Sequence, residues 1–176
     1  MSTPDFRKDL AFSMEPNYLR LMEEFYREYF HPMGKVTIQR INEIDEQRKG
    51  YDVLIIIDDG EQYIKVEEKV DRYQSPNIVL ELWSDINRKK GWLYTMRADL
   101  LAYHYKSTGI THMIPVCALK RAFAVYEAEW RDNYRIVLRE NKGWSTQIML
   151  VPVVDMWDAI RDISIHDHAI NHGERW

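Results

Sequence analysis

The hydrophobic side chains along the chain follow two periods, one helical and one alternating. Between residues 16 and 30, large apolar side chains recur three or four positions apart, which predicts an amphipathic helix. Pro16 and Asn17 suit the start of this helix, and the segment HPMG that follows suits its end. The apolar positions of the predicted helix face are Leu19, Met22, Phe25, Tyr26 and Tyr29.

Alternating patterns begin directly after this helix. Residues 35–42 carry apolar side chains near every second position, which predicts a strand. Two further β-rich runs, 52–57 and 62–70, flank the tight polar segment Asp58-Asp59-Gly60. A short segment of this kind between two such runs is typical of a β-hairpin, so we expect the two runs to pair antiparallel.

The rest of the chain alternates short apolar strands with two helical segments. The segment 117–130 has the spacing of a helix, and 154–163 is predicted as a short helix with Asp155 as its N-cap. Together the elements predict a mixed α/β (α+β) domain in which helices flank one central mixed sheet. We expect one domain over 1–165 and a C-terminal tail over 166–176. The further strands expected are 77–83, 99–105, 112–116, 134–138 and 146–153.

The composition fits a single domain and excludes several classes of protein. With 176 residues, 45% of them hydrophobic, the chain can bury a core without covalent cross-links. Cys117 is the only cysteine, so an internal disulfide cannot form. No apolar run reaches the length of a signal sequence or a membrane span, so we expect a cytoplasmic protein without a membrane partner. The net charge of −4 leaves nucleic-acid binding open, because local patches decide it.

Charged residues lie at the open end of the predicted hairpin, at the start of its first strand and the end of its second. Because strand residues alternate faces, Glu67 and Lys69 share one face about 7 Å apart, and the hairpin brings Asp52 close to both. Carboxylates without His or Cys beside them suit a hard cation such as Mg²⁺, for which Mn²⁺ would substitute. Such an ion activates water and neutralises charge on a phosphodiester, while Lys69 steers the water or stabilises the phosphate. A nearby cation and partial burial are expected to lower the pKa of Lys69.

The series Tyr51-Asp52, hairpin, Glu67-Glu68-Lys69 resembles the motif of the PD-(D/E)xK nuclease superfamily, with Tyr51 where that motif has proline. The resemblance extends from the first helix through about residue 70. It implies a restriction-endonuclease-like fold with an αβββαβ core and a Mg²⁺-dependent deoxyribonuclease, expected to be an endonuclease, that hydrolyses phosphodiester bonds. It also implies that Asp52 and Glu67 are metal ligands, that the main-chain carbonyl of Glu68 is a third, and that Lys69 is catalytic.

The same alternation places the Glu68 side chain on the opposite face, among Ile64, Val66 and Val70. A carboxylate there must be paired, neutral or near an edge, because a lone buried carboxylate is costly. A shift of one residue in register would exchange Glu67 and Glu68.

Two further acids and one basic segment are candidates for the same site. Glu24 on the first helix and Glu81 in the strand 77–83 would add carboxylates, although each also fits a solvated face. The basic segment fits DNA contacts if it lies near the motif, and an ordinary turn if it does not. Its candidate DNA contacts are Arg88, Lys89, Lys90, Trp92 and Arg97.

Several alternatives stay open on the sequence alone. Asp52, Glu67 and Lys69 would also fit a salt bridge across a hairpin. The competing function is a non-catalytic module that binds nucleic acid or a protein on a nuclease-like fold. Endonuclease, exonuclease and junction resolvase share this core, and a homodimer would suit a branched or palindromic DNA. His166, His168 and His172 have metal-like spacing, but an exposed tail is the favoured interpretation.

Overall fold

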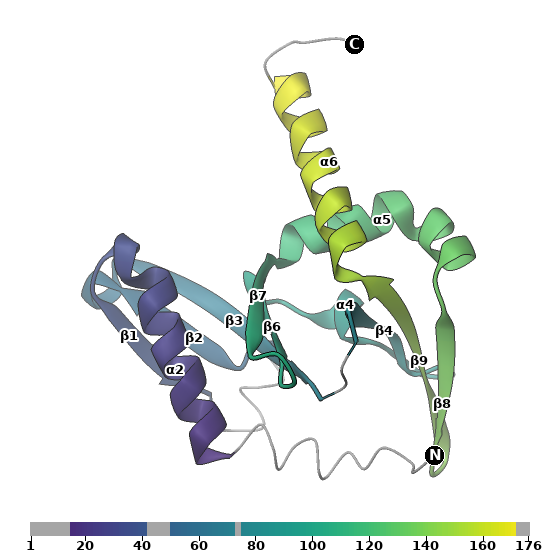
Figure 1. The fold of residues 1–176 in the computed structure, drawn as a ribbon, viewed down its shortest axis with the longest axis horizontal. Coiled ribbons are helices and arrows are strands. Elements are labelled where there is room, and N and C mark those ends of the chain that lie inside the picture. The colour runs from purple at the N-terminus through teal and green to yellow at the C-terminus, as the bar shows by residue number, and fades with distance from the viewer. Residues whose placement is uncertain (1–14, 42–49, 73–74, 172–176) are drawn as a thin grey trace.

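The computed structural model describes residues 15–41, 50–72 and 75–171, with side chains described through residue 165. Along the described chain the elements follow the order α2, β1, β2, β3, β4, β5, α4, β6, β7, α5, β8, β9 and α6, with two short 3₁₀ turns. Helices and strands occur in similar amounts and the larger sheet is mixed, which confirms the predicted α/β class (Figure 1).

The first sheet has five strands in the order β1-β2-β3-β6-β7. Its first three strands form an antiparallel meander, β3 then pairs parallel with β6, and β6 pairs antiparallel with β7. The predicted hairpin is confirmed, because Val53 lies opposite Val66 and Ile57 lies opposite Gln62. The bounds are β1 (Val36–Arg40), β2 (Val53–Ile57), β3 (Gln62–Asp71), β6 (Leu100–Tyr105) and β7 (Ile110–Pro115).

The chain also forms a second sheet, so the expectation of one central sheet is wrong. Its strands follow the order β5-β4-β9-β8, and every neighbouring pair is antiparallel. An alternating pattern marks a strand but does not name its partner, and β4 pairs with the distant β9 because both bury apolar side chains in the same core. The bounds are β4 (Asn77–Asp85), β5 (Lys89–Lys90), β8 (Ile136–Asn141) and β9 (Trp144–Pro152).

The crossover from β3 to its parallel neighbour β6 differs from a simple αβββαβ core. In the described part of this crossover the chain forms β4, β5 and then α4 (Trp92–Thr95), a helix of one turn. The implied order of helix, three strands, helix and strand is therefore present only with β4 and β5 inserted. The insertion matters for the site, because it carries Glu81 and the basic segment.

The helices match the sequence pattern at the start of the chain and extend it at the end. α2 (Pro16–Phe30) has the predicted bounds. α5 (Val116–Asn133) and α6 (Val153–Asn171) are longer than expected, and α6 continues past residue 166, where we expected a tail. Asp155 lies in the first turn of α6 and not at its N-cap, and its Oδ2 accepts a hydrogen bond from the Tyr134 hydroxyl at 2.7 Å. No helix in the described ranges is long and apolar enough to cross a membrane.

Two hydrophobic cores lie on opposite faces of the first sheet. α2 covers one face (Figure 1). On that face Tyr26 and Met22 share a buried cluster with Val66 and Ala102. The other face of β6 and β7 packs with the second sheet, α5 and α6 through residues such as Leu101 and Tyr103. Leu101 lies opposite Glu67 and Tyr103 lies opposite Lys69 in the β3–β6 pairing. The odd-numbered residues of β3 therefore face away from α2.

The tight turn of the β2–β3 hairpin is built by its two aspartates. Asp58 and Asp59 both adopt positive φ, at 47° and 55°, a conformation that Asp tolerates better than most residues. The Oδ1 of Asp58 accepts the Lys35 backbone N–H at 2.8 Å, and Asp59 pairs with the Lys35 ammonium at 2.9 Å. These contacts attach the turn to the start of β1, and the antiparallel pairing of β2 with β3 brings Asp52 back toward Glu67.

Candidate active site

Asp52 is held by its backbone at the junction of three strands. Its N–H donates to the Val66 carbonyl at 2.9 Å, and its carbonyl accepts the Ile41 N–H at 2.9 Å. Its side chain is also fixed, because the Oδ2 accepts the backbone N–H of Glu68 at 2.9 Å. The carboxylate therefore lies just before the start of β2, beside the part of β3 that carries the Glu-x-Lys motif.

Glu67 and Lys69 project from the same face of β3 and form a direct ion pair. Their side chains are 13% and 31% exposed, so the pair is largely removed from water. Burial raises the pKa of Glu67, and the charge of Asp52 raises it further, against the opposing effect of Lys69. The carboxyl of Glu67 is thus easier to protonate than an ordinary glutamate.

The pKa of Lys69 is raised, so the expectation that it is lowered is wrong for the groups of this chain. Burial does lower it, but the charges of Glu67, Asp52 and Glu81 outweigh burial. A lysine with a raised pKa carries its proton at neutral pH. Lys69 therefore offers a hydrogen-bond donor and a positive charge, and not a base.

The Glu68 side chain points to the opposite face, as the alternation predicts. One carboxylate oxygen lies 3.0 Å from the Arg40 guanidinium, and the other accepts the Tyr26 hydroxyl at 2.7 Å. The side chain is only 8% exposed, so this carboxylate is buried and paired, as a buried acid requires. Burial and the neighbouring Glu68 charge raise the pKa of Tyr26 well above its usual value. β3 therefore has the register in which the side chain of Glu67, and not that of Glu68, shares a face with Lys69.

The oxygen atoms around Asp52 and Glu67 fit a hard divalent cation. Among the described residues, the Oδ1 of Asp52 and the Oε2 of Glu67 accept no hydrogen bond. The N–H and C=O of one strand residue face the same neighbouring strand, so the Glu68 carbonyl faces the side on which Asp52 lies. Two carboxylates and one carbonyl suit Mg²⁺, which keeps waters and uses few protein ligands. Over the described ranges no three His, Cys, Asp or Glu side chains gather closely enough to form a larger metal cluster.

The two additional acids have different positions. Glu81 lies at an irregularity of β4, where the pairing with β9 shifts register, and its charge acts on Lys69. Its Oε1 accepts hydrogen bonds from the Ser84 hydroxyl and, at 3.3 Å, from the Trp92 backbone N–H. Glu24 is exposed on α2 and pairs with Arg20 at 4.0 Å. Because α2 covers the face opposite Glu67, the structure does not bring Glu24 into this cluster.

The last residue of the basic segment, Arg97, has its backbone next to the start of the motif. The backbone N–H of Arg97 donates to the Gly50 carbonyl at 3.2 Å, two residues before Asp52. Arg88, Lys89, Lys90 and Arg97 are exposed, and Lys90 lies 4.9 Å from the centre of the Tyr94 ring. Trp92 differs from these residues, because it packs against the larger core and is only partly exposed.

Three contributors to this region were not singled out from the sequence as part of the site. Arg40 and Tyr26 hold Glu68 from distant elements, and no local pattern marks that contact. Lys65 shares the outward face of β3 with Glu67, and the alternation of the strand could have identified it. Its ammonium lies 5.5 Å from the centre of the Tyr51 ring.

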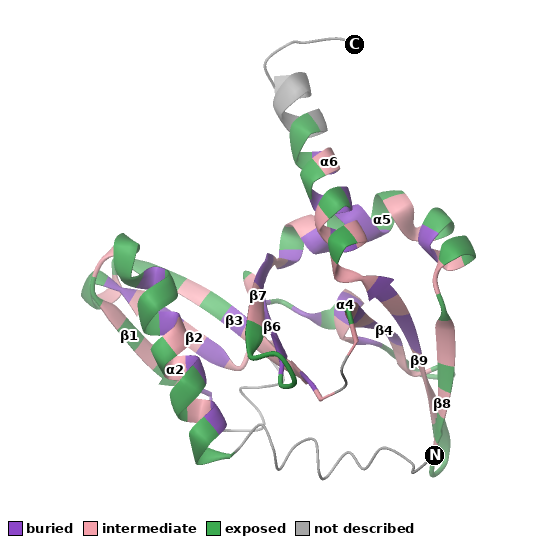
Figure 2. Ribbon diagram, viewed as in Figure 1, coloured by how far each residue is buried: buried purple, intermediate pink, exposed green. Residues whose placement is uncertain are grey.

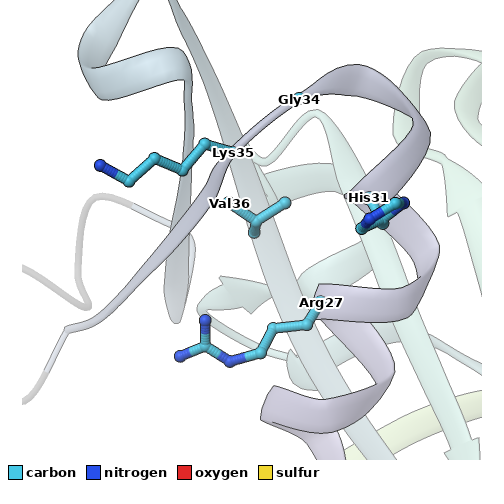
Figure 3. Close-up of a pocket in the computed structure, with 5 residues that line it drawn as sticks. All are labelled: Arg27, His31, Gly34, Lys35 and Val36. Atoms are coloured by element: carbon cyan, nitrogen blue, oxygen red, sulfur yellow. The ribbon is translucent and has the colours of Figure 1, made fainter.

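A shallow pocket of about 490 Å³ lies at the other end of the hairpin, away from the motif (Figure 3). It is lined by Arg27, His31, Gly34, Lys35 and Val36, and Lys35 already pairs with Asp59 across the turn. None of the residues predicted for the active site lines this pocket.

Comparisons of the chain with models of protein families, with curated proteins and with solved structures found no match.

Proposed function

We propose that this protein is a metal-dependent DNA nuclease that hydrolyses phosphodiester bonds. The observation that carries the proposal is the convergence of Asp52, Glu67 and Lys69 on adjacent strands, with the Glu68 peptide between them. A carboxylate pair that faces a protonated lysine suits a reaction in which negative charge grows on phosphate oxygens. The class that this arrangement fits is that of the PD-(D/E)xK nucleases.

Asp52 and Glu67 would hold a Mg²⁺ or Mn²⁺ ion together with the main-chain carbonyl of Glu68. When bound, the ion would supply activation of water and neutralisation of charge on the phosphodiester. Lys69 would donate hydrogen bonds to a non-bridging phosphate oxygen or to the attacking water, from the face of β3 that it shares with Glu67. Asp52 keeps its orientation because the Glu68 N–H and two neighbouring strands hold it.

The DNA backbone would lie between the motif and the basic segment. The Arg97 backbone lies beside Gly50. Burial lowers the pKa of Lys120, and the charge of the neighbouring Arg97 lowers it further. Lys120 also donates to the Met96 carbonyl at 2.6 Å, which fixes α5 against the segment after α4. Contacts from these basic side chains to DNA phosphates would position the DNA without reading its sequence.

The variant Asp52→Asn tests the proposal. Asparagine keeps the size of the side chain and an oxygen that accepts the Glu68 N–H, so the fold should be retained, while the charge that holds the cation is lost. With Mg²⁺ or Mn²⁺, wild-type protein should cut plasmid, linear duplex, single-stranded or branched DNA, and the variant should cut none of them. Mn²⁺ should also raise the melting temperature of the wild type and leave that of the variant unchanged. Undiminished cutting by Asp52→Asn would remove this residue from the site.

A non-catalytic nucleic-acid-binding module is the second candidate. It is favoured by one observation, the direct ion pair that already joins Glu67 to Lys69. If folded wild-type protein binds DNA, cuts none of the four substrates and shows no Mn²⁺-dependent rise in melting temperature, this second function is the correct one.

A further inference from the structure

The first three strands form an arm whose outer face leads to the candidate active site. The arm consists of β1, β2 and the residues of β3 before Val66, where pairing with β6 begins (Figure 1). α2 covers its inner face, and the strand side chains of the outer face are exposed or half-buried (Figure 2). None of these outer side chains is acidic, and four of them carry a polar group that can bond a phosphate or sugar. The six outer side chains are Thr37, Gln39, Leu54, Ile56, Tyr63 and Lys65.

Tyr63 is the most exposed aromatic side chain of this face, at 60%. It precedes Glu67 by four residues on the same face of β3, a separation of about 13 Å along the strand. Its hydroxyl lies over Gly60, where a Cβ atom would stand only 2.9 Å from it. The glycine therefore leaves room for the tyrosine ring to lie back along the hairpin turn.

Lys65 lies between Tyr63 and Glu67 on the same face, about 7 Å along the strand from each. Its backbone is fixed at the strand edge, since its N–H donates to the Asp99 carboxylate and its carbonyl accepts the Asp99 N–H, both at 2.8 Å. Lys65 is exposed, and its ammonium lies 5.5 Å from the centre of the ring of Tyr51, the residue that precedes Asp52. The positive charge of Lys65 therefore lies on the same face as Glu67, two residues nearer the hairpin turn than the proposed carboxylate pair of Asp52 and Glu67.

We propose that the outer face of the arm binds a single-stranded segment of DNA that adjoins the scissile phosphate. Lys65 contacts a backbone phosphate of this segment, and Tyr63 stacks on one of its bases. The inference rests on the proposed nuclease function for the position of the scissile phosphate. Bases within a duplex are stacked on one another, whereas an unpaired base offers its face to an aromatic side chain. The order of acidic pair, lysine and exposed tyrosine along one strand therefore favours a substrate with a single-stranded region over a blunt duplex.

The test measures binding without cleavage, so that it does not depend on the proposed reaction. A fluorescent oligonucleotide of about 12 nucleotides, within the range of known single-strand sites, is titrated with the full chain in EDTA, alone and annealed to its complement. Wild type should bind the single strand more tightly than the duplex. Tyr63→Ala should weaken single-strand binding roughly tenfold, the scale of one lost stacking contact. Tyr63→Phe should keep the affinity, because it keeps the ring.

Lys65→Gln gives a separate readout. Loss of one phosphate contact to a single strand should reduce the slope of log K against log salt concentration by about 0.7. Matched controls lie on the β8–β9 hairpin, where Trp144→Ala and Lys142→Gln remove an exposed aromatic ring and an exposed charge. Both control variants should bind like wild type.

The outcomes separate this inference from the proposed function. Loss of binding in Tyr63→Ala without any metal-dependent cutting by wild type would support the binding face and contradict the nuclease. Cutting of blunt duplex and single strand at equal rates, with Tyr63→Ala binding like wild type, would overturn the binding face and leave the nuclease. If sedimentation shows that wild type is a dimer and Tyr63→Ala a monomer, the face is occupied by a second copy, which also overturns the inference.

Discussion

The backbone N–H of Glu68 donates a hydrogen bond to the Oδ2 of Asp52 at 2.9 Å. The residue between Glu67 and Lys69 thus serves the candidate site through its peptide group, while its carboxylate lies on the other face with Arg40 and Tyr26. One position of the strand therefore has two roles. Its backbone orients the first acid of the motif, and its side chain fastens β3 to α2 and β1.

Glu67→Gln and Glu68→Gln should differ in what they change. Glu67→Gln removes a proposed ligand and should reduce metal-dependent cleavage by more than the roughly 10- to 100-fold typical of outer-shell partners. Glu68→Gln keeps the peptide group and should retain most of the cleavage activity. It should instead lower the free energy of unfolding by about 2 kcal/mol, because Arg40 loses a largely buried charged partner. Cleavage rates and urea unfolding of both variants measure the two effects. The reverse ranking would mean that the functional acid faces α2.

As the pH falls, metal binding should begin to weaken at a higher pH than it would if the ligand were a glutamate of ordinary pKa. Burial and the charge of Asp52 raise the pKa of Glu67, so protons compete with Mn²⁺ for this carboxylate before they reach an exposed one. The rise in melting temperature caused by Mn²⁺ should therefore shrink as the pH falls through the raised pKa of Glu67. A rise that persists down to the ordinary glutamate range, about pH 4.3, would contradict this assignment.

The raised pKa of Glu67 also predicts the direction in which the stability of the metal-free protein changes with pH. A carboxyl with a raised folded-state pKa stabilises the fold fully below its unfolded pKa, and this contribution is lost as the pH rises through the folded value. Relative to Glu67→Gln, the wild type should lose stability as the pH rises from about 4 toward neutrality. Asp52 and Glu81 remain near Lys69 in the variant, so the lysine keeps acidic neighbours across this range. Urea unfolding in EDTA at several pH values measures the difference, and a constant difference would contradict the shift.

Gly91→Ala should disturb the junction that carries Glu81 and the basic segment. A Cβ atom at Gly91 would lie 2.1 Å from the Glu81 carbonyl oxygen, so β4 and α4 would have to move apart. We expect a loss of about 3 kcal/mol of stability, the upper range for overpacking. Gly109→Ala is the matched control, since its φ is +71° but no atom lies within 4 Å of the added carbon, and it should cost about 1 kcal/mol. Equal losses in thermal or urea unfolding would show that the close approach of the two segments has no energetic role.

Arg97→Gln should weaken DNA binding without a change in fold. Its side chain is exposed beside Gly50, so it is free to contact a backbone phosphate near the motif. Removal of one such contact to duplex DNA should reduce the slope of log K against log salt concentration by about 0.9. Arg161→Gln on α6, another exposed arginine, is the control and should leave the slope unchanged. An unchanged slope for Arg97→Gln would place the DNA elsewhere.

Local periodicity was enough to predict the helix at 16–30, the hairpin strands and the separation of Glu67 from Glu68. These features depend on side-chain spacing within one element, with about 3.6 residues per helical turn and two per strand repeat. The alternation of β3 also settles which of its charges share a face, because no irregularity interrupts its pairing with β2 or β6. The motif acids and the lysine could therefore be placed on one face before any tertiary contact was known.

Only the tertiary structure decided how distant segments surround that face. It paired β4 with β9 in a second sheet, brought the charge of Glu81 to Lys69 and set Arg97 beside Gly50. It also supplied Arg40 and Tyr26 as the partners that a buried Glu68 requires. The spacing of residues within a strand says which side is apolar, but not which other apolar surface will cover it. That choice depends on how all the elements bury their apolar faces together, and this is why the surroundings of Asp52, Glu67 and Lys69 became visible only in the folded chain.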